Sequence, residues 1–143
     1  MEFLEINTPL LDSLTEQAKA SERLRMNLDL RTSSADTSQR MLNALQPGTV
    51  VPIHRHENTD ETVICLCGRL EEIIYEEVTE YERVLTSGGE DVVKKSLFKE
   101  VSRHLLCPTD GIYGMQIPAG TWHSIYVIEP SVIFDAKDGA YIP

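Results

Sequence analysis

The sequence has no long hydrophobic run and no excess of positive charge. No stretch approaches the ~20 consecutive apolar residues that cross a membrane, and the opening MEFLEINTPLLDS lacks the basic and apolar regions of a secretory signal. Thirteen Lys and Arg stand against 23 Asp and Glu, and the resulting net charge of −10 repels phosphate backbones and anionic membrane surfaces. We therefore expect a cytoplasmic protein with no nucleic-acid and no membrane partner.

Cysteine is scarce, and its spacing is poor for disulfides. Cys65 and Cys67 would lie two residues apart on the same side of a strand, a geometry that bridges badly, and Cys107 leaves an odd number. The C-x-C spacing also lacks the second pair of a thiolate zinc site, so we assign neither residue to a metal. We expect free thiols in a reducing compartment.

The N-terminal third predicts one helix and one strand. Residues 8–21 form the one clear helical segment, in which Thr8 can cap, Pro9 suits the first helical position and the leucines recur at helical spacing. In RLRMNLDLR, residues 23–31, apolar and polar residues then alternate, which is typical of a strand with one wet face.

The rest of the chain predicts many short strands separated by Gly, Pro, Asn, Asp and Ser. The expected strands lie at about 40–45, 49–54, 61–67, 69–78, 81–85, 97–101, 112–117, 123–128 and 131–136. Together with one small helix they favour an all-β antiparallel sandwich or barrel in a single domain over residues 1–143. Residues 86–103 are the most polar stretch, and we expect them to be a mobile excursion.

The stretch PIHRHENTDETVICLCGRL, residues 52–70, indicates a metal site. On an extended segment His54 and His56 share a face, and the turn residues between His56 and Glu61 allow Glu61 to open a new strand facing the same ion. A single histidine on a strand is more often a surface or core residue than a ligand. His-x-His followed by Glu across a turn arises much more rarely by chance.

A fourth ligand has to come from elsewhere in the sequence, and two histidines remain. His123 follows the turn IPAGTW directly and heads the apolar run HSIYVI, so its backbone is expected to be held rigidly. His104 has no such setting and reads as an ordinary polar residue. We therefore take His123 as the fourth candidate ligand.

These residues resemble the two motifs of the cupin superfamily. Residues 48–68 match the first motif, G-x5-H-x-H-x4-E-x6-G, at every defined position, and the spacing makes Gly68 its terminal turn. In the second motif, G-x5-P-x-G-x2-H-x3-N, Pro118, Gly120 and His123 match. Gly111 lies one residue too far upstream, and Val127 replaces the final Asn.

Further strings are similar to the WbuC-type cupin fold metalloproteins, a group associated with bacterial surface-polysaccharide gene clusters. They are the N-terminal helix with RLRMNLDLR, QRMLNALQPGT before the first motif, and PAGTWHSIYVIEPSVIFDAKDGAYIP at the end. The resemblance covers nearly the whole chain. It implies a small antiparallel β-barrel of the double-stranded β-helix or jelly-roll type, over residues 40–136, with an inter-motif insertion at 86–110.

The resemblance also implies that His54, His56, Glu61 and His123 line the barrel around one divalent ion. Three imidazoles and a carboxylate suit Fe, Mn, Ni or Zn, and an octahedral ion would keep two open positions. Cupins commonly pair through strand exchange, so we expect a homodimer to which the apolar face of residues 23–31 contributes.

The function that these features favour is that of a metal-dependent enzyme acting on a small oxygen-rich molecule, such as a sugar or nucleotide sugar. An isomerase, epimerase, lyase or oxygenase would use such an open ion. The alternative is a non-catalytic cupin that binds or senses a small molecule. Candidate substrate-binding residues are Arg40, Arg69, Lys137 and Tyr141. The net charge argues against an anionic substrate unless cations gather at the mouth of the pocket.

Overall fold

The helix predicted over 8–21 is present as α1, Thr8–Ala20, and its cap is Asn7. The computed structural model describes residues 2–140, and in it the Asn7 side chain accepts a hydrogen bond of 3.1 Å from a backbone N–H of the first turn. The expected cap, Thr8, is instead the first helical residue. Leu14 and Ala18, four residues apart, are buried on one side of the helix. Within residues 2–140 no helix is long and apolar enough to span a membrane.

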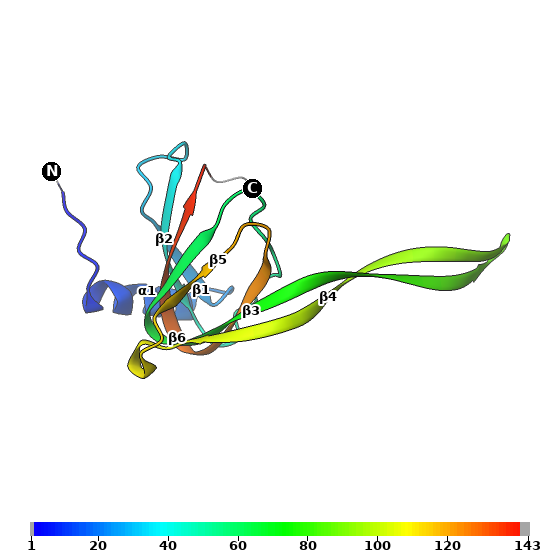
Figure 1. The fold of residues 1–143 in the computed structure, drawn as a ribbon. Coiled ribbons are helices and arrows are strands. Elements are labelled where there is room, and N and C mark those ends of the chain that lie inside the picture. Colours follow the sequence, from blue (N-terminus) through cyan, green and yellow to red (C-terminus); the bar gives the residue numbers. More distant parts are fainter. Residues whose placement is uncertain (1, 141–143) are drawn as a thin grey trace.

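The remainder is one antiparallel sheet, which confirms the predicted all-β class. Its strands are β1 (Arg25–Asp29), β2 (Ser38–Leu45), β3 (Glu61–Thr86), β4 (Gly89–Leu106), β5 (Gly114–Ile117) and β6 (Trp122–Asp138), with a short 3-10 helix η1 (Pro108–Asp110). The order is β1-β2-β6-β3-β4, and β5 pairs with β3. Among the described residues this pairing leaves β1 and β4 at the two ends, so the sheet curls around an interior without closing into a complete barrel (Figure 1).

The long strands β3 and β6 bend where two shorter strands were expected. Gly68 is not a turn but a bulge inside β3, with φ of 95°, and the pairing register with β6 shifts on both sides of it. A Cβ at this position would collide with the carbonyl oxygen of Pro130 and with Ser131, because the two strands cross closely there. The bend allows β6 to pair with both β2 and β3 through its C-terminal half.

The same irregularity corrects the expectation for the cysteines. A register shift between Cys65 and Cys67 sends them into different hydrophobic clusters. Cys65 packs with Val63 and Leu70 in the interior core, whereas Cys67 packs against the cluster beneath α1. They therefore do not share a side of the strand, and all three cysteines of the chain are free thiols, as predicted.

Strand β1 alternates as its sequence predicts, but its apolar face is covered. Met26, Leu28 and Leu30 pack with α1 and with the apolar residues of β2. The face that we expected to contribute to a dimer is thus buried by the helix of the same chain. Homodimer formation remains a prediction.

A two-stranded arm made by β3 and β4 projects from the body (Figure 1). The predicted excursion 86–103 is a turn followed by strand β4, which pairs with β3 continuously from Thr86 opposite Gly89 to Tyr75 opposite Glu100. None of residues 86–110 lines the cavity described below, so this insertion extends away from the cavity and does not cover it.

Candidate metal centre

Backbone hydrogen bonds between two loops position the histidines. The expected strand 49–54 is irregular except for an isolated bridge, in which the N–H of His54 donates to the carbonyl of His123 at 3.0 Å and the reverse bond measures 2.9 Å. Two residues further on, Gly120 N–H donates to the His56 carbonyl at 2.7 Å. Backbone hydrogen bonds therefore join the loop that carries His54 and His56 to the loop that leads to His123.

The turn before Glu61 has the predicted effect. The chain bends at Glu57 and Asn58, and β3 begins at Glu61. The Asp60 carboxylate accepts the Ala119 N–H at 2.8 Å, which ties this turn to the loop preceding His123. Glu61 consequently starts its strand on the side where the histidines lie.

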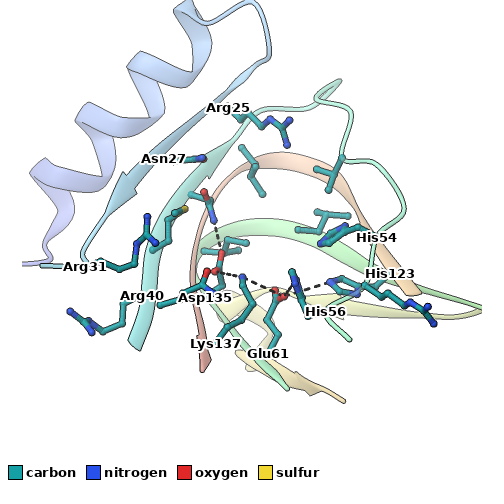
Figure 2. Close-up of a pocket in the computed structure, with 18 residues that line it drawn as sticks. Arg25, Asn27, Arg31, Arg40, His54, His56, Glu61, His123, Asp135 and Lys137 are labelled. Atoms are coloured by element: carbon teal, nitrogen blue, oxygen red, sulfur yellow. Dashed lines mark hydrogen bonds and ion pairs between the residues drawn. The ribbon is translucent and has the colours of Figure 1, made fainter. Parts of the chain in front are cut away.

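The four residues predicted as ligands converge. One donor atom from each of His54, His56, Glu61 and His123 lies within 4.8 Å of the donor atoms of the other three. Glu61 Oε2 lies 2.8 Å from His56 Nε2 and 3.6 Å from His123 Nε2 (Figure 2). These three atoms are buried, and none has a hydrogen-bond partner with acceptable geometry among the described residues. Such a concentration of unsatisfied polar atoms suits the binding of a cation.

The backbone fixes which ring nitrogen faces the centre. Nδ1 of His54 lies 2.8 Å from the Pro52 carbonyl, and Nδ1 of His123 lies 2.9 Å from the Thr121 carbonyl. A carbonyl oxygen can only accept, so each Nδ1 carries the proton and each neutral ring presents its Nε2 lone pair. This orientation is the usual one for a histidine that ligates a metal through Nε2.

The electrostatics suit a cation bound by neutral imidazoles and a carboxylate. Burial opposes the charge of Glu61, but contacts with His123, His56 and Lys137 outweigh it and lower its pKa. Burial lowers the pKa of His54. Burial also opposes the charge of His123, but its contact with Glu61 prevails and raises its pKa, so protons compete with a cation for this ring and metal binding is expected to depend on pH. The donor set fits a divalent transition metal.

A polar network continues from Glu61 into β6 and β2. Lys137 pairs directly opposite Glu61, and its Nζ lies 3.6 Å from Glu61 Oε2 and 3.0 Å from Asp135 Oδ1. Asn43 Nδ2 donates to the other oxygen of Asp135 at 2.5 Å. Burial opposes the Lys137 charge, yet the two carboxylates raise its pKa, so it is an ammonium held beside the centre.

The cluster forms part of the wall of a cavity of about 640 Å³, a size suited to small-molecule ligands. The apolar part of the wall includes Ile125 and Ile133. The polar part contains five cationic side chains and two carboxylates besides the histidines. These are Arg25, Arg31, Arg40, Arg55, Lys137, Glu61 and Asp135. Cations therefore do gather at the cavity, although the chain as a whole is acidic.

The four candidate substrate-binding residues occupy different places. Lys137 and Arg40 line the cavity, but Arg40 donates to the carbonyls of Ser38 and Leu30 and so supports the loop before β2. Arg69 does not line it, and pairs with Asp110 at 2.9 Å instead. Tyr141 lies outside the described residues.

The structure also places the remaining histidine and the cysteines away from the centre. His104 is exposed and shares a hydrogen bond of 2.9 Å with Ser102 Oγ. Burial raises the pKa of Cys65 to about 12, so this residue is a core thiol. Neither residue belongs to the cluster.

Sequence reasoning missed several polar residues that line the cavity or are buried near it. Arg25, Asn27, Asn43 and Asp135 line the cavity. The only sequence signal for the first two is the alternation of residues 23–31, which predicts a solvent-facing side just as well. Glu72 is fully buried, and neither of its carboxyl oxygens has a hydrogen-bond partner among the described residues. Burial raises the pKa of Glu72 to about 8, so it is a neutral acid at lower pH.

Solved structures with the same fold include KdgF from Halomonas sp., which is 16% identical over 82% of each chain with a TM-score of 0.53. The protein SPY1581 of unknown function from Streptococcus pyogenes is 13% identical over 85% of this chain and 80% of that one, with a TM-score of 0.55. An oxalate oxidase bound to the substrate analogue glycolate is 13% identical over 85% and 54%, with a TM-score of 0.53. At these identities the likeness shows a shared fold only.

No curated protein matches the sequence. A family model described as "Domain of unknown function (DUF6016)" matches residues 6–86. This segment contains α1, β1, β2, three of the four clustered residues and the first strand of the arm. Because the match spans more than half of the chain, the protein belongs to the DUF6016 family, and its fold is the all-β cupin fold.

Proposed function

We propose that the protein is a mononuclear metalloenzyme that acts on a small oxygen-rich molecule. The observation that carries this proposal is the convergence of three buried, unsatisfied donor atoms, from His56, Glu61 and His123, on the wall of an open cavity. A purely structural ion would not require an adjoining cavity of about 640 Å³.

The residues present define what could be bound. His54, His56, Glu61 and His123 would hold one Fe, Mn, Ni or Zn ion, whose Lewis acidity or redox chemistry would supply the activation of a bound oxygen group. The chain contributes the rest. Lys137 keeps Glu61 ionised, and the carbonyls of Pro52 and Thr121 hold two imidazoles in the ligating tautomer.

The finer assignment is to the WbuC-type cupin metalloproteins, with a sugar or nucleotide sugar as substrate in a cytoplasmic pathway. It is supported by the sequence strings quoted above and by the convergence of the residues that match the cupin motifs. The three free thiols agree with a reducing compartment.

Turnover is tested with metal-loaded protein and a panel of hexoses, hexuronates and nucleotide sugars, followed by proton NMR in D₂O. We expect the NMR spectrum of one class of sugar to change with time, or a hydrogen on the carbon beside its carbonyl group to be exchanged for deuterium. The His54→Ala, His123→Ala double variant should be inert. Binding without any chemical change, for every metal loaded, would contradict the enzyme and favour the non-catalytic binding module.

A further inference from the structure

Five cationic side chains line the cavity, and four of them already have carboxylate partners. These pairs are Arg31 with Asp29 at 2.7 Å, Arg40 with Asp36 at 3.4 Å, Arg55 with Glu57 at 3.0 Å and Lys137 with Asp135 at 3.0 Å. Each of these four cations therefore has a counter-charge within the protein. Only the fifth, Arg25, lacks an acidic partner within ion-pair distance among residues 2–140.

The guanidinium of Arg25 is incompletely satisfied as well as unpaired. The side chain is half-buried, and its Nε is a buried donor without a hydrogen-bond partner among the described residues. Burial, followed by repulsion from Arg23, lowers the pKa of Arg25. A guanidinium that is partly withdrawn from water beside another cation gains most from an anion, which its planar donors can bind in bidentate fashion.

The backbone directs Arg25 into the cavity. Leu24 has φ of 56°, a left-handed conformation that costs a leucine on the order of 1 kcal/mol, and strand β1 begins directly after it. Because Met26 and Leu28 face the helix, Arg25 and Asn27 face the opposite way, and both line the cavity. Figure 2 shows these two residues on the β1 side and the histidines on the other side.

We propose that Arg25, with Asn27 beside it, forms a subsite for an anionic group, a carboxylate or a phosphate, on a substrate whose other oxygen atoms reach the metal centre. This inference rests on the proposed function and narrows its substrate class to acidic sugars or sugar phosphates. It also gives a role to the one cavity-lining cation that has no acidic partner among residues 2–140, in a chain with a net charge of −10. A local positive field inside the cavity can select an anion that the outer surface does not attract.

The test measures binding of D-glucuronate, D-glucose 6-phosphate and D-glucose to the metal-loaded protein by calorimetry. Arg25→Gln removes the guanidinium, and Arg25→Lys keeps the charge without its planar donors. Arg23→Gln is the matched control. Arg23 lies two residues before Arg25 and carries the same charge, but its side chain is exposed and does not line the cavity. The metal content of every protein is measured in parallel.

We expect at least one anionic sugar to bind about tenfold more tightly than glucose, as one charged hydrogen-bonded contact would provide. Arg25→Gln should lose that difference, Arg25→Lys should keep part of it, and Arg23→Gln should stay within about twofold of the wild type. Which anionic sugar binds distinguishes carboxylate from phosphate.

Equal affinity for all three sugars, absence of binding, or full affinity in Arg25→Gln would overturn the subsite. A wild-type protein that takes up no metal would instead contradict the proposed function. The comparison of the sugars on that metal-free protein would still decide whether Arg25 binds anions.

Discussion

Two histidines of the centre are held by the carbonyls of residues that lie two positions before them. The Pro52 and Thr121 carbonyls accept from the Nδ1 atoms of His54 and His123, so the tautomers are set by backbone and not by a further side chain. Each of these bonds is local, and the loops that carry them are joined by the bridge between His54 and His123. The centre is thus preorganised by main-chain contacts before any ion arrives.

Glu72 is the residue whose charge state should affect stability most visibly. It is buried without hydrogen-bond partners, and its pKa is raised to about 8 from an ordinary value of 4.5. The folded protein therefore holds this proton more tightly than the unfolded chain, so stability is full below about pH 4.5 and falls as pH rises toward 8. Glu61 and Asp135 add to this effect, whereas His123 and Lys137 oppose it.

We predict that Glu72→Gln removes most of this pH dependence. The free energy of unfolding of the metal-free proteins is measured with urea at pH 5 and pH 8. Between these two pH values it should fall by on the order of 3 kcal/mol more in the wild type than in the variant. If the free energy of unfolding fell by the same amount in the two proteins between pH 5 and pH 8, the assignment of a buried neutral carboxyl to Glu72 would be wrong.

At the residue scale, the candidate ligands could be predicted because their signal is local. His54, His56 and Glu61 lie within eight residues, and the turn between them resets the strand. Arg25 could not be recognised in this way. It lies about thirty residues from His54 in sequence, and a polar residue on an alternating strand looks the same whether it faces water or a cavity.

At the scale of elements, the bend at Gly68 determines the shape of the interior. It lets β6 pair with β3 on both sides of the bulge, and it brings the N-terminal half of β3, headed by Glu61, against the C-terminal half of β6, which carries Lys137. Two features require a glycine at position 68. Its φ is positive, and Pro130 and Ser131 approach its backbone too closely for a side chain.

We predict that Gly68→Ala destabilises the protein by about 3 kcal/mol, because it adds a steric collision to backbone strain. Gly111→Ala is the control, since Gly111 also has a positive φ, of 76°, but a Cβ there would meet nothing within 4 Å. It should cost only about 1 kcal/mol. Urea unfolding measures both, and equal losses would show that the crossing at Gly68 has room for a methyl group.

The helix and the all-β class were predictable from periodicity, whereas the joining of strands was not. Turn residues such as Pro130 and Gly68 predict the end of a strand. In the structure β6 and β3 continue past these residues, because the two strands pair with each other on both sides of them. The polar segment 86–103 was misread for the same reason. Nothing in its composition shows that it pairs with residues 75–86 in a ribbon.

At the scale of the whole molecule, the projecting arm argues for association. Tyr81, Leu85, Val92 and Val101 are each more than half exposed on it, and Phe98 is 41% exposed. A two-stranded ribbon that stands alone in water is only marginally stable, and its edges remain open to pairing. A second copy of the chain would cover both features.

We predict a homodimer, visible by light scattering as twice the chain mass of 16.1 kDa. Replacing residues 78–97 by a tight Asn-Gly turn should give a folded monomer if the arm forms the contact. A monomeric wild type at all accessible concentrations would remove the prediction, and a dimer that survives arm removal would place the interface elsewhere.

The most direct test of the metal centre is the metal content of the purified protein after it is loaded separately with Fe, Mn, Ni or Zn and desalted. We predict about one equivalent per chain for at least one of these metals, both in the wild type and in His104→Ala, whose exposed histidine lies outside the cluster. The His54→Ala, His123→Ala double variant should lose it. A full equivalent retained in the double variant, or no bound metal in the wild type, would contradict the assignment of these residues as metal ligands.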